Sequence, residues 1–184
     1  MPVYILRHEE RLNDNSFNSS LTKRGLHNAI NLADRLHTLN IDTIYCSPFI
    51  RAIQTVHPYS IKYNVPINIE NSLIEFLERN DIVPYKQCII YNKQEQTYWN
   101  LNHTYKSQLS SEIVSQYQEQ KKVETMNDVK YRVSKFIDYL RTVGVKQNIL
   151  LVSHKTPLYF LWKYISIRSQ SLLLEMGEIA KLIA

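Results

Sequence analysis

Glycine is scarce in this sequence, and features that would indicate several other classes of protein are missing. Only three of the 184 residues are glycine, and only two are cysteine, Cys46 and Cys88. Two widely separated cysteines exclude a disulfide scaffold and a cysteine-based zinc finger, so we expect two free thiols. No apolar run approaches the roughly 20 residues of a membrane-spanning helix, which predicts no membrane association. The N-terminal residues lack the basic-then-apolar order of a secretion signal, which favours a cytoplasmic location.

The charge balance indicates a ligand with negative charge but no nucleic-acid partner. Lysine and arginine number 22 against 17 acidic residues, which gives a formal net charge of +5. The basic residues are scattered through the chain and form no long run, unlike the clustered charge of a nucleic-acid-binding surface. Hydrophobic residues make up 44% of the chain, enough for a core, and no linker divides it. We therefore expect one domain over residues 1–184.

Short apolar runs alternate with segments of helical periodicity along most of the chain. This alternation predicts an α/β fold, a three-layer sandwich in which helices flank a mostly parallel central sheet. Ser47-Pro48 is a typical helix start, Thr125 with Asp128 resembles a capping box, and Gly144 is placed to end that helix. The predicted strands are 3–6, 41–46, 65–69 and 148–152. The predicted helices begin at Thr22, Ser47 (ending near Pro58), Ser110, Thr125 and Pro157.

Three of the predicted strands end in residues suited to phosphate chemistry. Arg7 and His8 follow the first strand, and Ser47 follows the second, with Arg51 one turn later. His154 follows the strand at 148–152. Ligands bind at the carboxyl ends of strands in open parallel sheets, and a helix N-terminus at Ser47 would favour an anion. Each residue alone is more often a surface or core residue, but their joint occurrence predicts one anion site.

An ordered set of motifs resembles the histidine phosphatase superfamily, which has the phosphoglycerate-mutase-like fold. The match covers roughly residues 3–76 and 125–165, and the intervening residues 77–124 carry no motif. The stretch from Arg7 to Leu12 also resembles the R-H-G-E-R branch, which includes the ecdysteroid-phosphate phosphatases. The motifs are Arg7-His8-x-Glu10, Leu21-Thr22-x-x-Gly25, Ser47-Pro48-x-x-Arg51-Ala52-x-Gln54-Thr55, Leu73-x-Glu75 and Ser153-His154.

The resemblance implies a metal-independent phosphomonoesterase that forms a phosphohistidine. His8 would be the nucleophile, and Glu75 the general acid that protonates the leaving oxygen. Arg7, Arg51 and His154 would surround the phosphate oxygens, and the sequence contains no metal-ligand cluster. Two further residues, Arg11 from the R-H-G-E-R branch and Ser47, are candidates for substrate binding. No cofactor is implied, and the expected partner is a phosphorylated small molecule or a phosphopeptide.

Two substitutions depart from the family pattern and leave alternative functions open. Glu9 replaces the glycine that follows the nucleophile, and Lys155 replaces the glycine after the second histidine. A carboxylate at residue 9 would repel a phosphate dianion if it pointed inward, so we expect Glu9 to turn away. The alternatives are a catalytically weak or silent phospho-ligand-binding module, favoured by Glu9, and a phosphoglycerate-type mutase. The short chain favours the phosphatase over the mutase.

Residues 77–124 are predicted to form an irregular insertion. Specificity in such folds resides in loops and insertions, so this segment is the expected source of substrate selection. Its aromatic residues could line a pocket, but packing in a core or lid is the favoured interpretation. No feature of the sequence indicates an oligomeric state. The aromatic residues in question are Tyr85, Tyr91, Tyr98, Trp99 and Tyr105.

Overall fold

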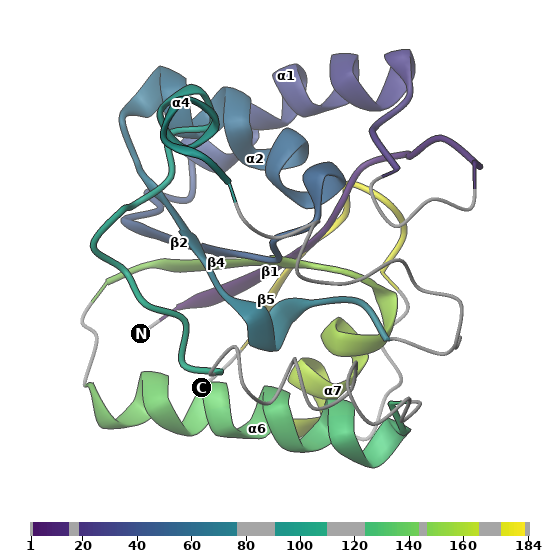
Figure 1. Ribbon diagram of the computed structural model, residues 1–184, viewed down its shortest axis with the longest axis vertical. Helices are drawn as coiled ribbons and strands as arrows, with labels where there is room; N and C mark the ends of the chain where they lie inside the picture. The colour runs from purple at the N-terminus through teal and green to yellow at the C-terminus, as the bar shows by residue number, and fades with distance from the viewer. Residues whose placement is uncertain are drawn as a thin grey trace.

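A central sheet with helices on both faces organises the part of the chain that the structure describes (Figure 1). The structure is a computed structural model, and it describes residues 2–14, 19–76, 91–109, 124–143, 147–165 and 174–182. The strand order is β3-β2-β4-β1-β5, in which β1 to β4 pair in parallel and β5 pairs antiparallel with β1. The predicted three-layer α/β fold is confirmed. The strands are β1 (Val3–Arg7), β2 (Thr43–Cys46), β3 (Ile67–Ile69), β4 (Ile149–Ser153) and β5 (Ile179–Leu182).

The helices form the two outer layers of the sandwich. Figure 1 shows α1, α2 and α4 over one face of the sheet and α6 and α7 over the other. Among the described residues, no helix is long and apolar enough to cross a membrane. The helices are α1 (Lys23–His37), α2 (Ile50–Tyr63), α4 (Lys93–Tyr98), α6 (Met126–Thr142) and α7 (Lys155–Ile165), and η1 (Asn71–Leu73) is a short 3₁₀ turn.

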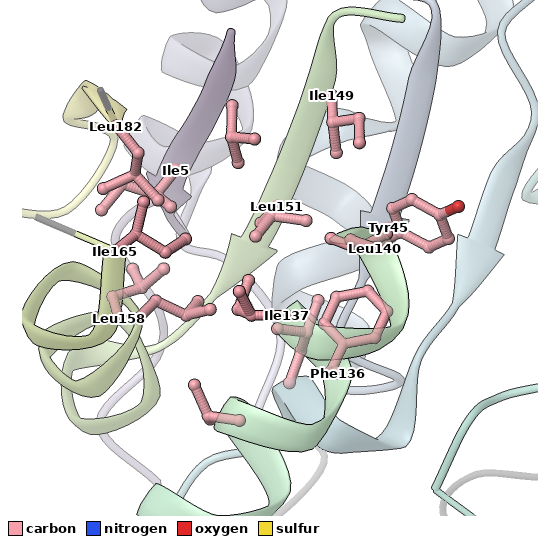
Figure 2. Packing of buried hydrophobic residues seen from close by; sticks show 14 of the residues in the cluster. Ile5, Tyr45, Phe136, Ile137, Leu140, Ile149, Leu151, Leu158, Ile165 and Leu182 are labelled. Carbon is pink, nitrogen blue, oxygen red and sulfur yellow. The ribbon is translucent and has the colours of Figure 1, made fainter. Parts of the chain in front are cut away.

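Alternation along the central strands divides the apolar residues between two cores. In β4, Ile149 and Leu151 face the α6 and α7 side, whereas Leu150 and Val152 face the α1 and α2 side. Successive side chains of a strand point to opposite faces, so a strand covered on both sides reads as a continuous apolar run. Figure 2 shows Leu151 packed with Phe136 and its neighbours from α6 between helix and sheet.

The polar residues predicted to begin α1 and α6 do so. The Thr22 side chain accepts a hydrogen bond from the Gly25 amide, and Thr125 and Asp128 form a reciprocal capping box. These bonds satisfy amide groups that have no partner within the first turn of a helix. The predicted α6 boundary is therefore confirmed at its N-terminus, whereas Gly144 lies outside the described residues.

Two predicted helix starts are wrong, and so is one predicted end. Helix α2 begins at Ile50, because the Ser47 amide still bonds to β4 and the residue that precedes the helix is Phe49. The same helix passes through Pro58 and ends at Tyr63, since buried side chains on both sides of the proline hold it in place. Helix α7 begins at Lys155, separated from β4 by His154 alone, and not at Pro157.

Part of the predicted irregular insertion is ordered and packs against the sheet layers. Residues 93–98 form α4, whose capping box is made by Asn92 and Glu95. Tyr105 packs against the core beside α6, and Tyr91 and Trp99 pack against the core beside α2. Core packing is thus confirmed for these three aromatic residues, while Tyr98 is exposed. The predicted helix from Ser110, as well as Tyr85 and Cys88, lies outside the described residues.

Candidate active site

The residues that follow β1, β2 and β4 meet at one edge of the sheet because of the strand register. Arg7 of β1 lies opposite Ser153 of β4. The next amide, that of His8, donates to the Ser153 carbonyl oxygen at 3.1 Å. Beyond β2, the Ser47 amide donates to the carbonyl oxygen of Val152 at 2.9 Å. The residues that follow these three strands are distant in the sequence but therefore lie side by side, as the motif positions predicted.

His8 is held as a neutral imidazole with one defined free nitrogen. Its Nδ1 lies 2.7 Å from the carbonyl oxygen of Glu9. A carbonyl oxygen only accepts, so Nδ1 carries the proton and Nε2 carries the lone pair. Burial lowers the pKa of His8 from 6.5 to about 3, together with the positive charges of Arg51, Arg7 and Arg11, while the hydrogen bond to the Glu9 carbonyl oxygen opposes the shift. The Nε2 atom is therefore available as a nucleophile at any ordinary pH.

His154 lies beside His8, and the two rings form an edge-to-face pair. Their centroids are 5.0 Å apart. His154 is fully buried, and burial together with neighbouring positive charge lowers its pKa well below 6.5. Its Nε2 lies 2.8 Å from the Ser47 hydroxyl, and its Nδ1 lies 3.9 Å from Oε2 of Glu75. Ser47, expected to begin a helix and bind substrate, is thus in contact with the second histidine.

Arg7 and Arg51 bring two positive charges to the same edge of the sheet. Nη1 of Arg7 donates to the carbonyl oxygen of Leu174 at 2.9 Å, which fixes its guanidinium. Arg51 is 6% exposed and stacks on the Phe49 ring, with Cζ 4.6 Å from the ring centroid. Burial lowers the pKa of Arg51 to about 10, so it remains charged near neutral pH. Both arginines influence the pKa of His8, as expected for cations around one site.

Arg11 lies at the outer side of this site. Its charge contributes to the lowered pKa values of both His8 and Arg51. Its Nη1 donates to the carbonyl oxygen of Leu12 at 3.1 Å and to the Ser19 hydroxyl at 3.3 Å. Arg11 is therefore near the other cations, with its guanidinium directed partly into its own loop.

Glu75 lies in the segment after η1, and its carboxyl group lies beside His154. Its side chain is 29% exposed, and Oε1 accepts a hydrogen bond from the Phe76 amide at 2.9 Å. Burial of the carboxyl raises its pKa above 4.5, while the Phe76 hydrogen bond and the charges of Arg51 and other arginines oppose the rise. A carboxyl group with a raised pKa beside a neutral histidine can deliver a proton to a departing oxygen.

The Glu9 carboxylate points away from the two histidines. Its Oε2 accepts a hydrogen bond from Nδ2 of Asn28, in α1, at 3.2 Å. Its other oxygen lies against Gly177, where an added Cβ would overlap with it. The expectation that Glu9 turns away is confirmed, and the carboxylate lies between the Asn28 amide and Gly177. Like-charge repulsion between Glu9 and an anion at His8 is thereby reduced.

Two groups of supporting contacts were not predicted from the sequence, although Thr55 stands in one of the motifs. The Thr55 hydroxyl accepts from the Glu9 amide at 2.9 Å and donates to the Arg51 carbonyl oxygen at 2.7 Å, so it ties two motifs together. Arg132 forms a buried ion pair with Glu124 at 2.7 Å. The sequence does contain a signal for Arg132, because it is a charged residue on the apolar face of the helix predicted from Thr125. A charge in that position requires a buried partner.

The assembled groups are suited to transfer of a phosphoryl group. A neutral imidazole nitrogen, a carboxyl group with raised pKa and several cations converge on one edge of the sheet. Among the described residues, Nδ1 of His154 and Nε of Arg7 are buried without a protein hydrogen-bond partner. Both atoms can donate to an anion. Within the described ranges, no three His, Cys, Asp or Glu side chains are grouped to hold a metal ion.

Comparison with known families gives one match that spans most of the chain. The sequence model described as the histidine phosphatase superfamily (branch 1) matches residues 3–177. A comparison with curated proteins found no significant match.

Solved structures with the same fold include both phosphatases and a mutase. Ecdysone phosphate phosphatase from Bombix mori, in complex with tungstate, has a TM-score of 0.70 at 15% identity, covering 100% of this chain and 89% of that one. A putative α-ribazole-5′-P phosphatase from Escherichia coli has a TM-score of 0.66 at 22% identity, covering 98% and 89%. Phosphoglycerate mutase from Bacillus anthracis has a TM-score of 0.68 at 19% identity, covering 98% and 86%. At these identities the likeness establishes the fold.

Proposed function

Because this chain belongs to the histidine phosphatase superfamily, we propose that it is a metal-independent phosphomonoesterase with His8 as its nucleophile. The observation that carries the proposal is the hydrogen bond between Nδ1 of His8 and the Glu9 carbonyl oxygen. That bond leaves the Nε2 lone pair free, and the pKa of about 3 keeps it free. A neutral imidazole can form a covalent intermediate and divide one difficult step into two easier ones.

The proposed reaction has two steps that return the enzyme to its starting state. In the first, Nε2 of His8 attacks phosphorus, the bond to the leaving oxygen breaks, and that oxygen takes the proton of Glu75. In the second, water attacks phosphorus, the N–P bond breaks, and the Glu75 carboxylate accepts the water's proton. Inorganic phosphate then leaves, and Nε2 regains its lone pair. The raised pKa of Glu75 suits both of its roles.

The cations surround the transferring group in this proposal. Arg7 and Arg51 would bind phosphate oxygens through their planar guanidinium groups, which stay charged at working pH. His154 would donate from Nδ1, because a Ser47 hydroxyl that donates to Nε2 places the proton on the opposite nitrogen. Ser47 would therefore act on substrate through His154. Arg11 is the further candidate contact, reached by a rotation away from its own loop.

The expected substrate is a phosphorylated small molecule or a phosphopeptide. Phosphatases with the same fold, one holding tungstate, support a substrate with a phosphate group. Tyr91 of the predicted insertion donates to the Pro48 carbonyl oxygen at 2.6 Å, directly beside Ser47. This contact supports the insertion as the element that selects the rest of the substrate. A screen of phosphosugars, nucleotides, phosphotyrosine peptides and steroid phosphates would identify the preferred class.

Turnover of a generic aryl phosphate with EDTA present tests the proposed activity. The wild type should release phosphate, and His8→Ala should release none. His27→Ala, on the exposed surface of α1, is the matched control and should equal the wild type. Activity that EDTA removes would contradict metal independence. A folded wild type without turnover would favour the silent binding module, and transfer of phosphate to a second hydroxyl rather than to water would favour the mutase.

A further inference from the structure

The segment that carries Glu75 is held in place by hydrogen bonds to its backbone from α6. Nη1 of Arg132 donates to the Ser72 carbonyl oxygen at 2.6 Å, and Nη2 lies 3.4 Å from the carbonyl oxygen of Glu75 itself. Ser72 lies in η1 and Glu75 is the second residue after that turn, so one guanidinium bridges the turn and the segment that follows it. Arg132 does not contact the Glu75 carboxyl group through any of these bonds. Its hydrogen bonds act on the position of that group through the backbone, and its charge also lowers the pKa of the carboxyl.

The Arg132 guanidinium is fixed in turn by a buried carboxylate. Nε donates to Oε1 of Glu124 at 2.7 Å, and Nη2 lies 3.3 Å from Oε2. The two side chains are 3% and 0% exposed. A planar guanidinium can pair with a carboxylate on one edge and with carbonyl oxygens on the other, whereas the single ammonium of lysine cannot. The neutralising carboxylate also reduces the attraction of Arg132 for phosphate.

The same segment is held by two further bonds, one from the sheet and one from the residue that caps η1. The Ser153 hydroxyl, at the end of β4, donates to the Leu73 carbonyl oxygen at 2.6 Å. The buried Glu70 carboxylate accepts from the Ser72 amide at 2.8 Å. These bonds fix the start of the segment, but neither reaches residue 75. The carbonyl group of Glu75 is reached from α6, by Arg132.

We propose that Arg132 is a positioning residue that places the Glu75 carboxyl group for proton transfer to the leaving oxygen. This inference rests on the proposed function. Buried ion pairs contribute little to stability compared with apolar residues of similar size, so stability alone is a poor explanation for this pair. A general acid must lie within hydrogen-bond reach of the oxygen that it protonates, and a small displacement sharply lowers the rate.

The test compares leaving groups that need the proton with leaving groups that do not. Phenyl phosphate has a basic leaving group, whereas p-nitrophenyl phosphate has a weakly basic one. The double variant Arg132→Met/Glu124→Leu removes both charges while it keeps apolar volume in the core. Arg132→Lys keeps the charge without the planar geometry. Arg141→Met is the matched control, because Arg141 lies on the same helix in an exposed ion pair with Asp138.

The double variant should lose about tenfold or more in kcat/KM for phenyl phosphate, with little change in kcat/KM for p-nitrophenyl phosphate, because this parameter reports the first step and not the water step that both substrates share. Arg132→Lys should show the same selective loss, and it decides the question alone if the double variant does not fold. Arg141→Met should match the wild type. Equal losses for both substrates, or no loss in folded variants, would overturn the inference alone. A wild type that is inactive on both substrates would instead refute the proposed function, and with it the role of Glu75 as general acid.

Discussion

At the residue scale, the environment of each side chain at the sheet edge sets its protonation state. Burial and nearby arginines lower the pKa of His8 to about 3, whereas burial raises the pKa of Glu75. The two groups therefore have opposite protonation states over a shared pH range: the His8 imidazole is an unprotonated base, and the Glu75 carboxyl is a protonated acid. Such divergent pKa values are a property of acid–base pairs in enzymes. The arginines next to His8 in the motifs already predict that it is neutral, whereas the largest cause of both shifts, burial, is not visible in the sequence.

The first residue-scale prediction concerns Glu75. Glu75→Gln removes the transferable proton but keeps the size of the side chain, so it should slow phenyl phosphate turnover far more than p-nitrophenyl phosphate turnover. We expect a difference of about 100-fold between the two losses, within the usual range for general acid catalysis. Steady-state kcat/KM for the two substrates is the measurement, because it reports the first step and not the water step that both substrates share. Asp138→Asn, an exposed carboxylate on α6, is the control. Equal losses for both substrates would contradict the role of Glu75.

The second residue-scale prediction concerns Glu9, whose carboxylate accepts a hydrogen bond from Asn28 and lies against Gly177. Because this charge points away from the histidines, Glu9→Gly should change kcat/KM by no more than about threefold. It should also lower the stability by about 1 kcal/mol, since it adds backbone freedom and removes a buried contact. Kinetics and thermal unfolding measure the two effects, with Glu9→Gln as the variant that keeps the shape. A tenfold rise in kcat/KM would show instead that the carboxylate opposes phosphate binding.

At the element scale, the turn before β5 packs against the loop that carries His8. The Gly177 amide donates to the Arg7 carbonyl oxygen at 3.0 Å, and the Arg7 amide donates to the Glu178 carbonyl oxygen at 3.3 Å. Leu174 in the same turn accepts from the Arg7 guanidinium. Strand β5, which follows this turn and pairs antiparallel with β1, was not predicted. The sequence at 174–182 carries neither an alternating apolar pattern nor a motif of the site.

A substitution at Gly177 tests the fit between this turn and Glu9. Gly177 has a φ of 73°, a conformation that residues with a Cβ rarely adopt, and an added Cβ would overlap with the Glu9 carboxylate. Gly177→Ala should therefore destabilise the protein by about 2 kcal/mol. In the Glu9→Gly background the overlap is gone, so the same substitution should cost about 1 kcal/mol. Chemical denaturation of the four proteins measures the coupling, and additive effects would contradict the contact.

Local signals in the sequence predicted some element boundaries well and others poorly. The capping box at Thr125 fixed the start of α6 because all of its hydrogen bonds are local. Ser47-Pro48 carries an equally typical helix signal, yet α2 begins at Ile50. The reason is tertiary: the Ser47 amide continues the pairing with β4, and its hydroxyl meets His154. Boundaries set by contacts between distant segments are therefore the ones that the sequence pattern missed.

At the scale of the whole molecule, the position of the site was predictable and its supporting contacts were not. The polar residues that end three apolar runs are visible in the sequence, and parallel pairing brings them to one edge. The buried pair of Arg132 and Glu124 joins α6 to the Glu75 segment through hydrogen bonds to backbone carbonyl oxygens. The only trace of these contacts in the sequence is a charged residue on the apolar face of the predicted helix. The ordering of residues 91–109 likewise depends on packing against other layers.

The buried histidine should also make the stability of the protein depend on pH. The pKa of His8 is about 3 in the folded state and near 6.5 when exposed, so the unfolded state binds more protons between these values. The free energy of unfolding should therefore fall as the pH is lowered from about 6.5 towards 3, by up to about 1.4 kcal/mol per pH unit for this group. His8→Gln, which cannot gain this charge, should show a shallower fall in urea denaturation. Identical slopes would contradict the assignment.

The central claim is that the phosphoryl group is transferred to Nε2 of His8. The most direct measurement is rapid acid-free quenching of the enzyme during turnover of a ³²P-labelled aryl phosphate, followed by peptide mapping. One labelled peptide containing His8 is expected, with an adduct that is stable to base and labile to acid. No label is expected in His8→Ala, and normal label is expected in His27→Ala. Label that persists in His8→Ala, or that maps to another residue, would contradict transfer to His8.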